Sequence, residues 1–341
     1  MKITHKPRIP VAPPPKKPTL LMNIGVGWSA TTPFLYTLSI DQRYCHPGHI
    51  KENHYLRMIF EQDCCNKFDI HKFILSTSAN EKQWIFRKWQ KELFEYSYHF
   101  LDDPDYIKEW YSLPVTIDKY IDYYLGLHEK TKGTYQAVAD FTNYNFELPE
   151  EFLIEWRDKM SQYFNVKVTF QFRDPIRRYF SEVGKFIQGK LILPGFDSHK
   201  IKHNAYVKSK QHIKLFRHYI SSYPIFPPAY YTQNIEKFKR VFGEERVMPI
   251  IMEQFWNPER KTEQCERLSD FLNYKITEIH ENAYYPDRGT NAPHYEGLKD
   301  QWGSDFEDIT PELYEWSMKY LGSIYDEWKE YFGSLPREWG H

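Results

Sequence analysis

The amino-acid sequence predicts an α/β domain with a central parallel sheet flanked by helices. Short buried runs typical of strands alternate with longer segments of helical periodicity, and this alternation favours parallel strands joined by helices. Neither an internal repeat nor a clear linker interrupts the order. We therefore expect one domain over residues 18–341, preceded by a flexible, proline-rich tail over residues 1–17.

The expected elements follow one another in the order that such a sheet requires. Apolar and β-branched runs predict strands at residues 19–24, 135–142, 166–172 and 246–252. Periodicity and helix-start signals predict helices at residues 32–41, 79–101, 115–129, 148–160, 173–186, 232–243, 266–274 and 311–332. Residues 42–60 are expected to form a loop leading into an aromatic-rich segment, and residues 186–204 a surface insertion.

Composition and charge favour a globular protein that binds neither nucleic acid nor membranes. Hydrophobic residues make up 41% and charged residues 27% of the chain, and the net charge of -1 gives no basic field for a polyanion. No run approaches the roughly 20 apolar residues that span a bilayer, and the basic first segment lacks the apolar core of a secretory signal.

Cysteine and histidine usage adds two further expectations. Four cysteines at irregular spacing indicate free thiols in a reducing, cytoplasmic compartment. The many Lys, Tyr, Asn and Ile residues suggest a bacterial or viral source. His199 and His203 share helical spacing but have no third ligand nearby, so no metal site is expected. The sequence leaves the oligomeric state open.

A glycine- and hydroxyl-rich loop follows the first predicted strand. Gly25 and Gly27 allow positive φ or a close approach of the backbone, and hydroxyl residues follow where a helix begins. Backbone N–H groups at such a helix start favour an anion. The predicted anion-binding residues of this loop are Gly25, Val26, Gly27, Trp28, Ser29, Ala30, Thr31 and Thr32.

Two common nucleotide-binding patterns fit this loop poorly. The Walker pattern requires glycine and lysine where Ala30 and Thr31 stand. A GxGxxA dinucleotide pattern does match at Gly25, Gly27 and Ala30, but it needs a second strand that ends in an acidic residue. The corresponding stretch, RYCHPGHIKE, is a poor strand.

A second candidate site follows the predicted strand at residues 166–172. The segment RDPIRRYFS places Arg173 where a strand tip meets a helix start, which is the usual ligand edge of an open parallel sheet. Asp174 and Pro175 suit the first helical turn. Ser181 lies two turns on, on the same side as Arg173 and Arg177, and an arginine fork with a hydroxyl can grip a phosphate.

Together the two sites resemble the sulfotransferases that use 3'-phosphoadenosine 5'-phosphosulfate (PAPS). That family has R-[DN]-P-x-x-R-x-x-S after a strand, and Arg173, Asp174, Pro175, Arg178 and Ser181 match every defined position. The resemblance implies a P-loop-NTPase-like three-layer fold and adenosine 3',5'-bisphosphate (PAP) as a product. It also implies that Arg173 and Ser181 contact the 3'-phosphate and that the first loop holds the 5'-phosphosulfate. Whether Arg178 contacts phosphate or packs stays open.

Two weaker matches extend the resemblance over most of residues 18–335. HPGHIKENHYL, residues 46–56, resembles a segment of carbohydrate sulfotransferases related to the heparan sulfate enzymes, and implies Glu52 as general base beside Lys51 and His54. RGTNAPHY, residues 288–295, stands where the family has a loop over the cofactor, which implies a role for Arg288 and Gly289. The implied acceptor is a small molecule or a glycan, most simply a sugar hydroxyl.

Three positions depart from the family pattern. Trp28 replaces the lysine of the loop, Phe141 stands where a strand-end lysine is expected, and Asn143 replaces a proline. A cation at the loop would stabilise the leaving phosphate. The candidates to replace it are Lys51, Arg288 and Arg43, in that order. The alternatives are a PAP- or PAPS-binding protein with weak or no catalysis and, further off, a nucleotide kinase.

Overall fold

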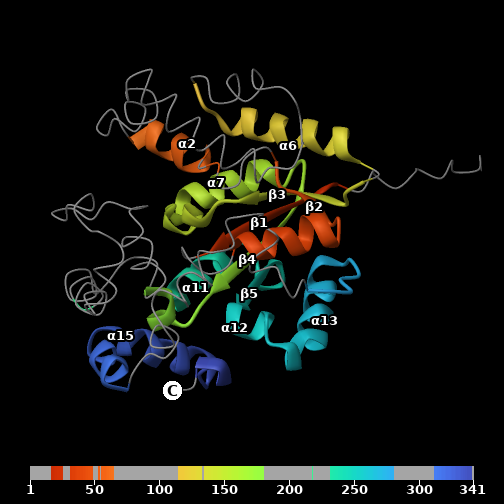
Figure 1. Ribbon diagram of the computed structural model, residues 1–341. Coiled ribbons are helices and arrows are strands. Elements are labelled where there is room, and N and C mark those ends of the chain that lie inside the picture. Colours follow the sequence, from red (N-terminus) through yellow and green to blue (C-terminus); the bar gives the residue numbers. More distant parts are fainter. Residues whose placement is uncertain are drawn as a thin grey trace, which may run out of the picture.

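The computed structural model describes residues 17–25, 31–48, 53, 55–64, 114–132, 134–179, 217, 231–279 and 311–339. Its centre is a parallel sheet of five strands in the order β2-β3-β1-β4-β5 (Figure 1). The strands are β1 (Thr19–Gly25), β2 (Cys45–His46), β3 (Ala137–Phe141), β4 (Asn165–Phe172) and β5 (Val247–Ile251). The predicted α/β fold with a central parallel sheet is confirmed.

The strand order reverses at β1. After β1 the chain passes to one side, where β2 and β3 pair, and it then crosses to the other side, where β4 and β5 pair. β1 therefore pairs with β3 on one side and with β4 on the other. In open parallel sheets ligands bind at such a reversal, outside the carboxyl ends of the strands. The fold thus points to the edge where β1 and β4 end.

Helices cover both faces of the sheet. Alternate residues of each strand point to opposite faces, so each face carries apolar side chains that helices bury. Leu20, Met22 and Ile24 of β1 pack in one apolar cluster, and Leu21 packs in the other. The first cluster contains residues of α2 (Tyr55–Cys64), α6 (Ile117–Thr131), α7 (Glu150–Met160), α11 (Tyr231–Phe242) and α15 (Pro311–Phe332). The second contains residues of α1 (Thr31–Tyr36), α12 (Met252–Phe255) and α13 (Lys261–Leu272).

Most predicted elements are confirmed with small shifts at their ends. A π-helical turn, Thr37–Asp41, completes the helix predicted at residues 32–41. The prediction of a loop over residues 42–60 is wrong in two places, because β2 lies inside it and α2 begins at Tyr55. A two-residue strand leaves too little pattern to recognise. The tail at residues 1–17, apart from Lys17, the helix at 79–101 and the insertion at 186–204 lie outside the described residues.

No described helix combines the length and the apolar character that crossing a lipid bilayer would require.

Candidate functional site

Gly25, the last residue of β1, lies where three other segments of the chain come close to it. A Cβ atom on Gly25 would lie 2.5 Å from Thr31 Cγ2, 3.5 Å from Asn143 Oδ1 and 3.5 Å from Gln171 Cβ. Its φ is not positive, so space rather than backbone conformation calls for glycine here. Thr31 begins α1, as the sequence predicts for a loop that leads into a helix.

The turn after β4 forms as the sequence predicts. The helix begins at Pro175, and the carboxylate of Asp174 accepts a hydrogen bond from the Arg177 N–H at 2.9 Å. The Tyr325 hydroxyl donates to the same carboxylate oxygen at 3.2 Å. Asp174 is therefore a helix cap, which satisfies an N–H group that the first helical turn would leave without a partner.

Arg173 is held at the edge of the sheet by neighbours of both its backbone and its side chain. Its carbonyl oxygen accepts a hydrogen bond from the Tyr231 hydroxyl at 2.8 Å. Its Nε lies 3.9 Å from Oε1 of Glu253, and its side chain is 14% exposed. A guanidinium that is fixed but still reaches solvent suits the recognition of an anion.

The other two arginines of the turn have separate surroundings. Arg178 is 1% exposed, and its guanidinium carbon lies 4.6 Å from the ring centre of Tyr179. Arg177 is exposed. Arg178 is therefore buried beside the turn, whereas Arg173 keeps partial exposure at the sheet edge. Whether Arg178 contacts a phosphate stays open.

The register of the sheet brings the two predicted sites together. Gly25 of β1 pairs with Gln171 of β4, and Arg173 follows two residues later. The end of β1, the start of α1 and the turn after β4 therefore share the carboxyl edge at the strand-order reversal. This proximity allows one ligand with two anionic groups to contact both the end of β1 and the turn after β4.

A polar pair that sequence reasoning missed lies beside this edge. Asn23 and Gln171 are 0% and 1% exposed, and both lie on the face of the sheet that α1 covers. The Asn23 side-chain oxygen Oδ1 accepts a hydrogen bond from the Thr169 hydroxyl at 2.8 Å. Among the described residues, neither amide atom of Gln171 has a partner, and the Asn23 amide nitrogen has none either. The signal available in the sequence was that each of these amide side chains lies inside a predicted strand.

Asn53 is a described residue that lies next to the predicted base in the sequence. Asn53, between Glu52 and His54, caps α2 by accepting from the Tyr55 N–H at 2.9 Å, and its amide donates to the Tyr124 hydroxyl at 3.1 Å. Asn53 also bonds to the carboxylate of Asp140, the fourth residue of β3. The segment thus starts α2 near the carboxyl end of β3, on the ligand edge.

Asp140 is the buried acid of this region. It is 0% exposed, and burial raises its pKa above the ordinary value. Hydrogen bonds from the Thr142 hydroxyl at 2.5 Å and the Tyr120 hydroxyl at 2.7 Å oppose that rise. The network ties β3 to α6 and to the residue beside the predicted base.

The structure places two of the residues considered as sources of positive charge. Phe141, at the end of β3, is 0% exposed, and its ring centre lies 6.3 Å from that of Phe34, so its side chain belongs to the apolar interior. Arg43 precedes β2, and the next residue, Tyr44, accepts backbone hydrogen bonds from the residues that begin β3. Arg43 therefore lies at the amino edge of the sheet, and its candidacy as the replacement for the loop lysine is wrong.

The remaining predicted residues lie outside the described part of the chain, and their roles stay predictions. They are Val26, Gly27, Trp28, Ser29, Ala30, Lys51, Glu52, His54, Ser181, Arg288 and Gly289. Thr32 is described as part of α1 without its side chain. Within the described residues, no group of three His, Cys, Asp or Glu side chains is arranged to hold a metal ion.

Comparisons with known proteins identify the fold. No protein-family model and no curated protein matches the chain. Among solved structures, a sulfotransferase from Alicyclobacillus acidocaldarius is similar, with a TM-score of 0.50 and 13% identity over 94% of this chain and 98% of that one. The sulfotransferase domain from the Synechococcus PCC 7002 olefin synthase has a TM-score of 0.40 and 17% identity over 92% and 96%. The first likeness shows that this chain shares the fold of that sulfotransferase.

Proposed function

We propose that the chain is a sulfotransferase that moves the sulfonate of PAPS to an acceptor hydroxyl or amine and releases PAP. The carrying observation is the position of Arg173, which the Asp174-Pro175 turn presents at the carboxyl edge beside Gly25. The close fit around Gly25, which a single Cβ would fill, supports a loop whose backbone approaches an anion. The orphaned amide of Gln171 lies at the same place.

In this proposal each part of the edge has one task. PAPS supplies the activated sulfonate. The loop over residues 25–32 holds the 5'-phosphosulfate through backbone N–H groups and hydroxyls, and Arg173 with Ser181 holds the 3'-phosphate. Arg288 and Gly289 cover the nucleotide. Glu52, beside His54, accepts the proton of the acceptor hydroxyl as the hydroxyl attacks sulfur. Holding both reactants in line supplies much of the rate.

The proposed acceptor is a sugar hydroxyl, carried by a small molecule or a glycan. Its support is the likeness of HPGHIKENHYL to the carbohydrate-type enzymes. The Asn53 contacts add that this segment begins α2 close to the ligand edge. Lys51 and Arg288 remain the candidates for the cation that Trp28 does not supply.

A second candidate function is PAP or PAPS binding with little or no transfer. The observation that favours it is the buried ring of Phe141, together with the position of Arg43 at the opposite edge, since both remove a source of positive charge at the leaving phosphate. Binding of PAP without transfer of labelled sulfonate to any sugar acceptor would favour this second candidate.

Titration of PAP into the purified chain by calorimetry tests the cofactor site. We expect micromolar binding, weakened about tenfold or more in Arg173→Ala, because a charged hydrogen bond contributes about 1.5–3 kcal/mol. Arg177→Ala is the matched control, since it removes an exposed arginine of the same turn and should change the affinity by less than about threefold. Absence of binding at millimolar PAP would contradict the proposal.

A further inference from the structure

A carboxylate stands beside Arg173 at the carboxyl edge. Glu253 lies two residues beyond the end of β5 and is the second residue of α12. Its side chain is 11% exposed, and burial raises its pKa, against the opposing effect of the Arg173 guanidinium. The pairing of Phe172 with Ile251 in the sheet explains this position, because Arg173 and Glu253 follow one and two residues beyond that pair.

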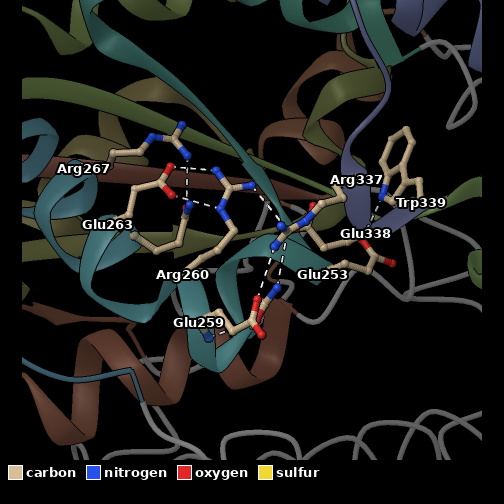
Figure 2. Close-up of polar contacts among 10 residues, drawn as sticks. Glu253, Glu259, Arg260, Glu263, Arg267, Arg337, Glu338 and Trp339 are labelled. Carbon is tan, nitrogen blue, oxygen red and sulfur yellow. Dashed lines mark hydrogen bonds and ion pairs between the residues drawn. The ribbon is translucent and has the colours of Figure 1, made fainter.

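Glu253 joins the turn after β4 to the last described segment of the chain. Its Oε1 accepts from the Asp174 N–H at 3.0 Å and lies 3.9 Å from Arg173 Nε. Its Oε2 accepts from the indole N–H of Trp339 at 3.0 Å (Figure 2). One carboxylate thus contacts the proposed phosphate-binding turn with one oxygen and the helix η8 (Arg337–Trp339) with the other.

The ring of Trp339 is packed against the same residues that hold the turn. Trp339 is 1% exposed, and its ring centre lies 6.3 Å from that of Tyr231 and 6.1 Å from that of Tyr325. Tyr231 donates to the Arg173 carbonyl, and Tyr325 donates to the Asp174 carboxylate. The indole therefore reaches the turn through ring packing as well as through its hydrogen bond to Glu253.

Polar contacts attach η8 to the segment before α13. Arg260 Nη1 lies 3.3 Å from Glu338 Oε1, and the Asn257 amide donates to the same oxygen at 3.5 Å. Arg337 pairs with Glu259 at 3.3 Å, as Figure 2 shows, but both side chains are largely exposed and this pair stabilises little. These contacts hold the helix, while only Trp339 contacts Glu253 among the η8 residues drawn.

We propose that Glu253 is a positioning residue for Arg173, and that η8 keeps Glu253 in place through the indole N–H of Trp339. This inference rests on the proposed function. An arginine side chain loses rotamer freedom when it grips a phosphate, and a carboxylate that restricts it beforehand reduces that loss. A site whose supporting groups are loose binds and reacts poorly even when every contacting residue is present.

The test is PAP affinity in Trp339→Phe, a change that keeps an aromatic ring, removes the N–H donor and alters no charge. We expect PAP binding to weaken about three- to tenfold, within the range for residues that act through another residue. Trp328→Phe is the matched control. Trp328 is 1% exposed and lies 4.7 Å from Trp339 in the same cluster, so it should lose comparable packing and leave PAP affinity unchanged.

The Arg173→Ala background separates positioning from general loosening of the structure. If η8 acts through Arg173, Trp339→Phe should add nothing to the weakening already caused by Arg173→Ala. Wild-type affinity in Trp339→Phe, an equal loss in Trp328→Phe, or an undiminished loss in the Arg173→Ala background would each overturn this inference alone. Failure of the wild-type chain to bind PAP would overturn it together with the proposed function.

Discussion

At the residue scale, the carboxyl edge contains buried polar groups that have no partner among the described residues. Leaving a buried donor without a partner costs free energy, whereas an apolar side chain of the same shape avoids that cost. Gln171, at 1% exposure, is in this position among the described residues, and it pairs in register with Gly25. Such a cost at a strand tip is consistent with selection for binding rather than for stability.

Gln171→Met should therefore stabilise the ligand-free protein. We expect the free energy of unfolding in urea to rise by about 1–3 kcal/mol, and PAP affinity to fall if the amide donates to the bound anion. Thr169→Val is the control, because Thr169 donates to Asn23 and its loss should destabilise by about 1 kcal/mol. A decrease in stability for Gln171→Met would contradict the interpretation of its amide as unsatisfied.

At the element scale, Gly48, the second residue after β2, has little freedom. Gly48 has a φ of +80°, and a Cβ atom there would lie 2.7 Å from the Tyr123 hydroxyl of α6. The Gly48 N–H donates to His46 Nδ1 at 3.1 Å. Gly48 is thus packed against α6, and a glycine is required there for both backbone conformation and space.

Gly48→Ala should destabilise the protein more than Gly333→Ala does. Gly333 has a φ of +78°, and a Cβ atom there would have no neighbour within 4 Å among the described residues, so its substitution isolates the backbone strain of about 1–2 kcal/mol. Gly48→Ala adds a displacement of Tyr123, which is 2% exposed and has little room to move. Urea unfolding of the two variants measures the difference, and equal losses would show that the α6 contact yields without cost.

The elements that could be predicted are those with a long local pattern. The runs in β1 and β4 are apolar or β-branched, and the helix over residues 311–332 keeps its periodicity over many turns. β2 has two residues and no pattern of its own, because its place depends on pairing with β3. For the same reason Glu253 and Trp339 escaped notice, since 86 residues separate them and only the folded chain brings them together.

At the scale of the whole molecule, chain topology explains why only part of the candidate site could be predicted from the sequence. The turn after β4 has a local sequence pattern, so Arg173 could be predicted as a candidate site residue from the sequence. Gly25 and Glu253 come from the end of β1 and from α12 after β5, and sheet order decides that they lie at the same edge. Which cation lies near the loop after β1 also depends on how the whole chain folds. Arg43 was a reasonable candidate from the sequence, but the fold places it at the amino edge of the sheet.

The free energy of unfolding of the whole chain should depend on pH through its buried acid, Asp140. Burial raises the pKa of Asp140 above 3.8, so the folded state keeps this proton at pH values where the unfolded state has lost it. The contribution of Asp140 to stability is therefore complete below pH 3.8 and falls as the pH rises through the folded-state pKa. Asp140→Asn, which has no such proton, should gain stability relative to the wild type over that rise. A wild-type advantage over Asp140→Asn that grows with pH would contradict the assignment.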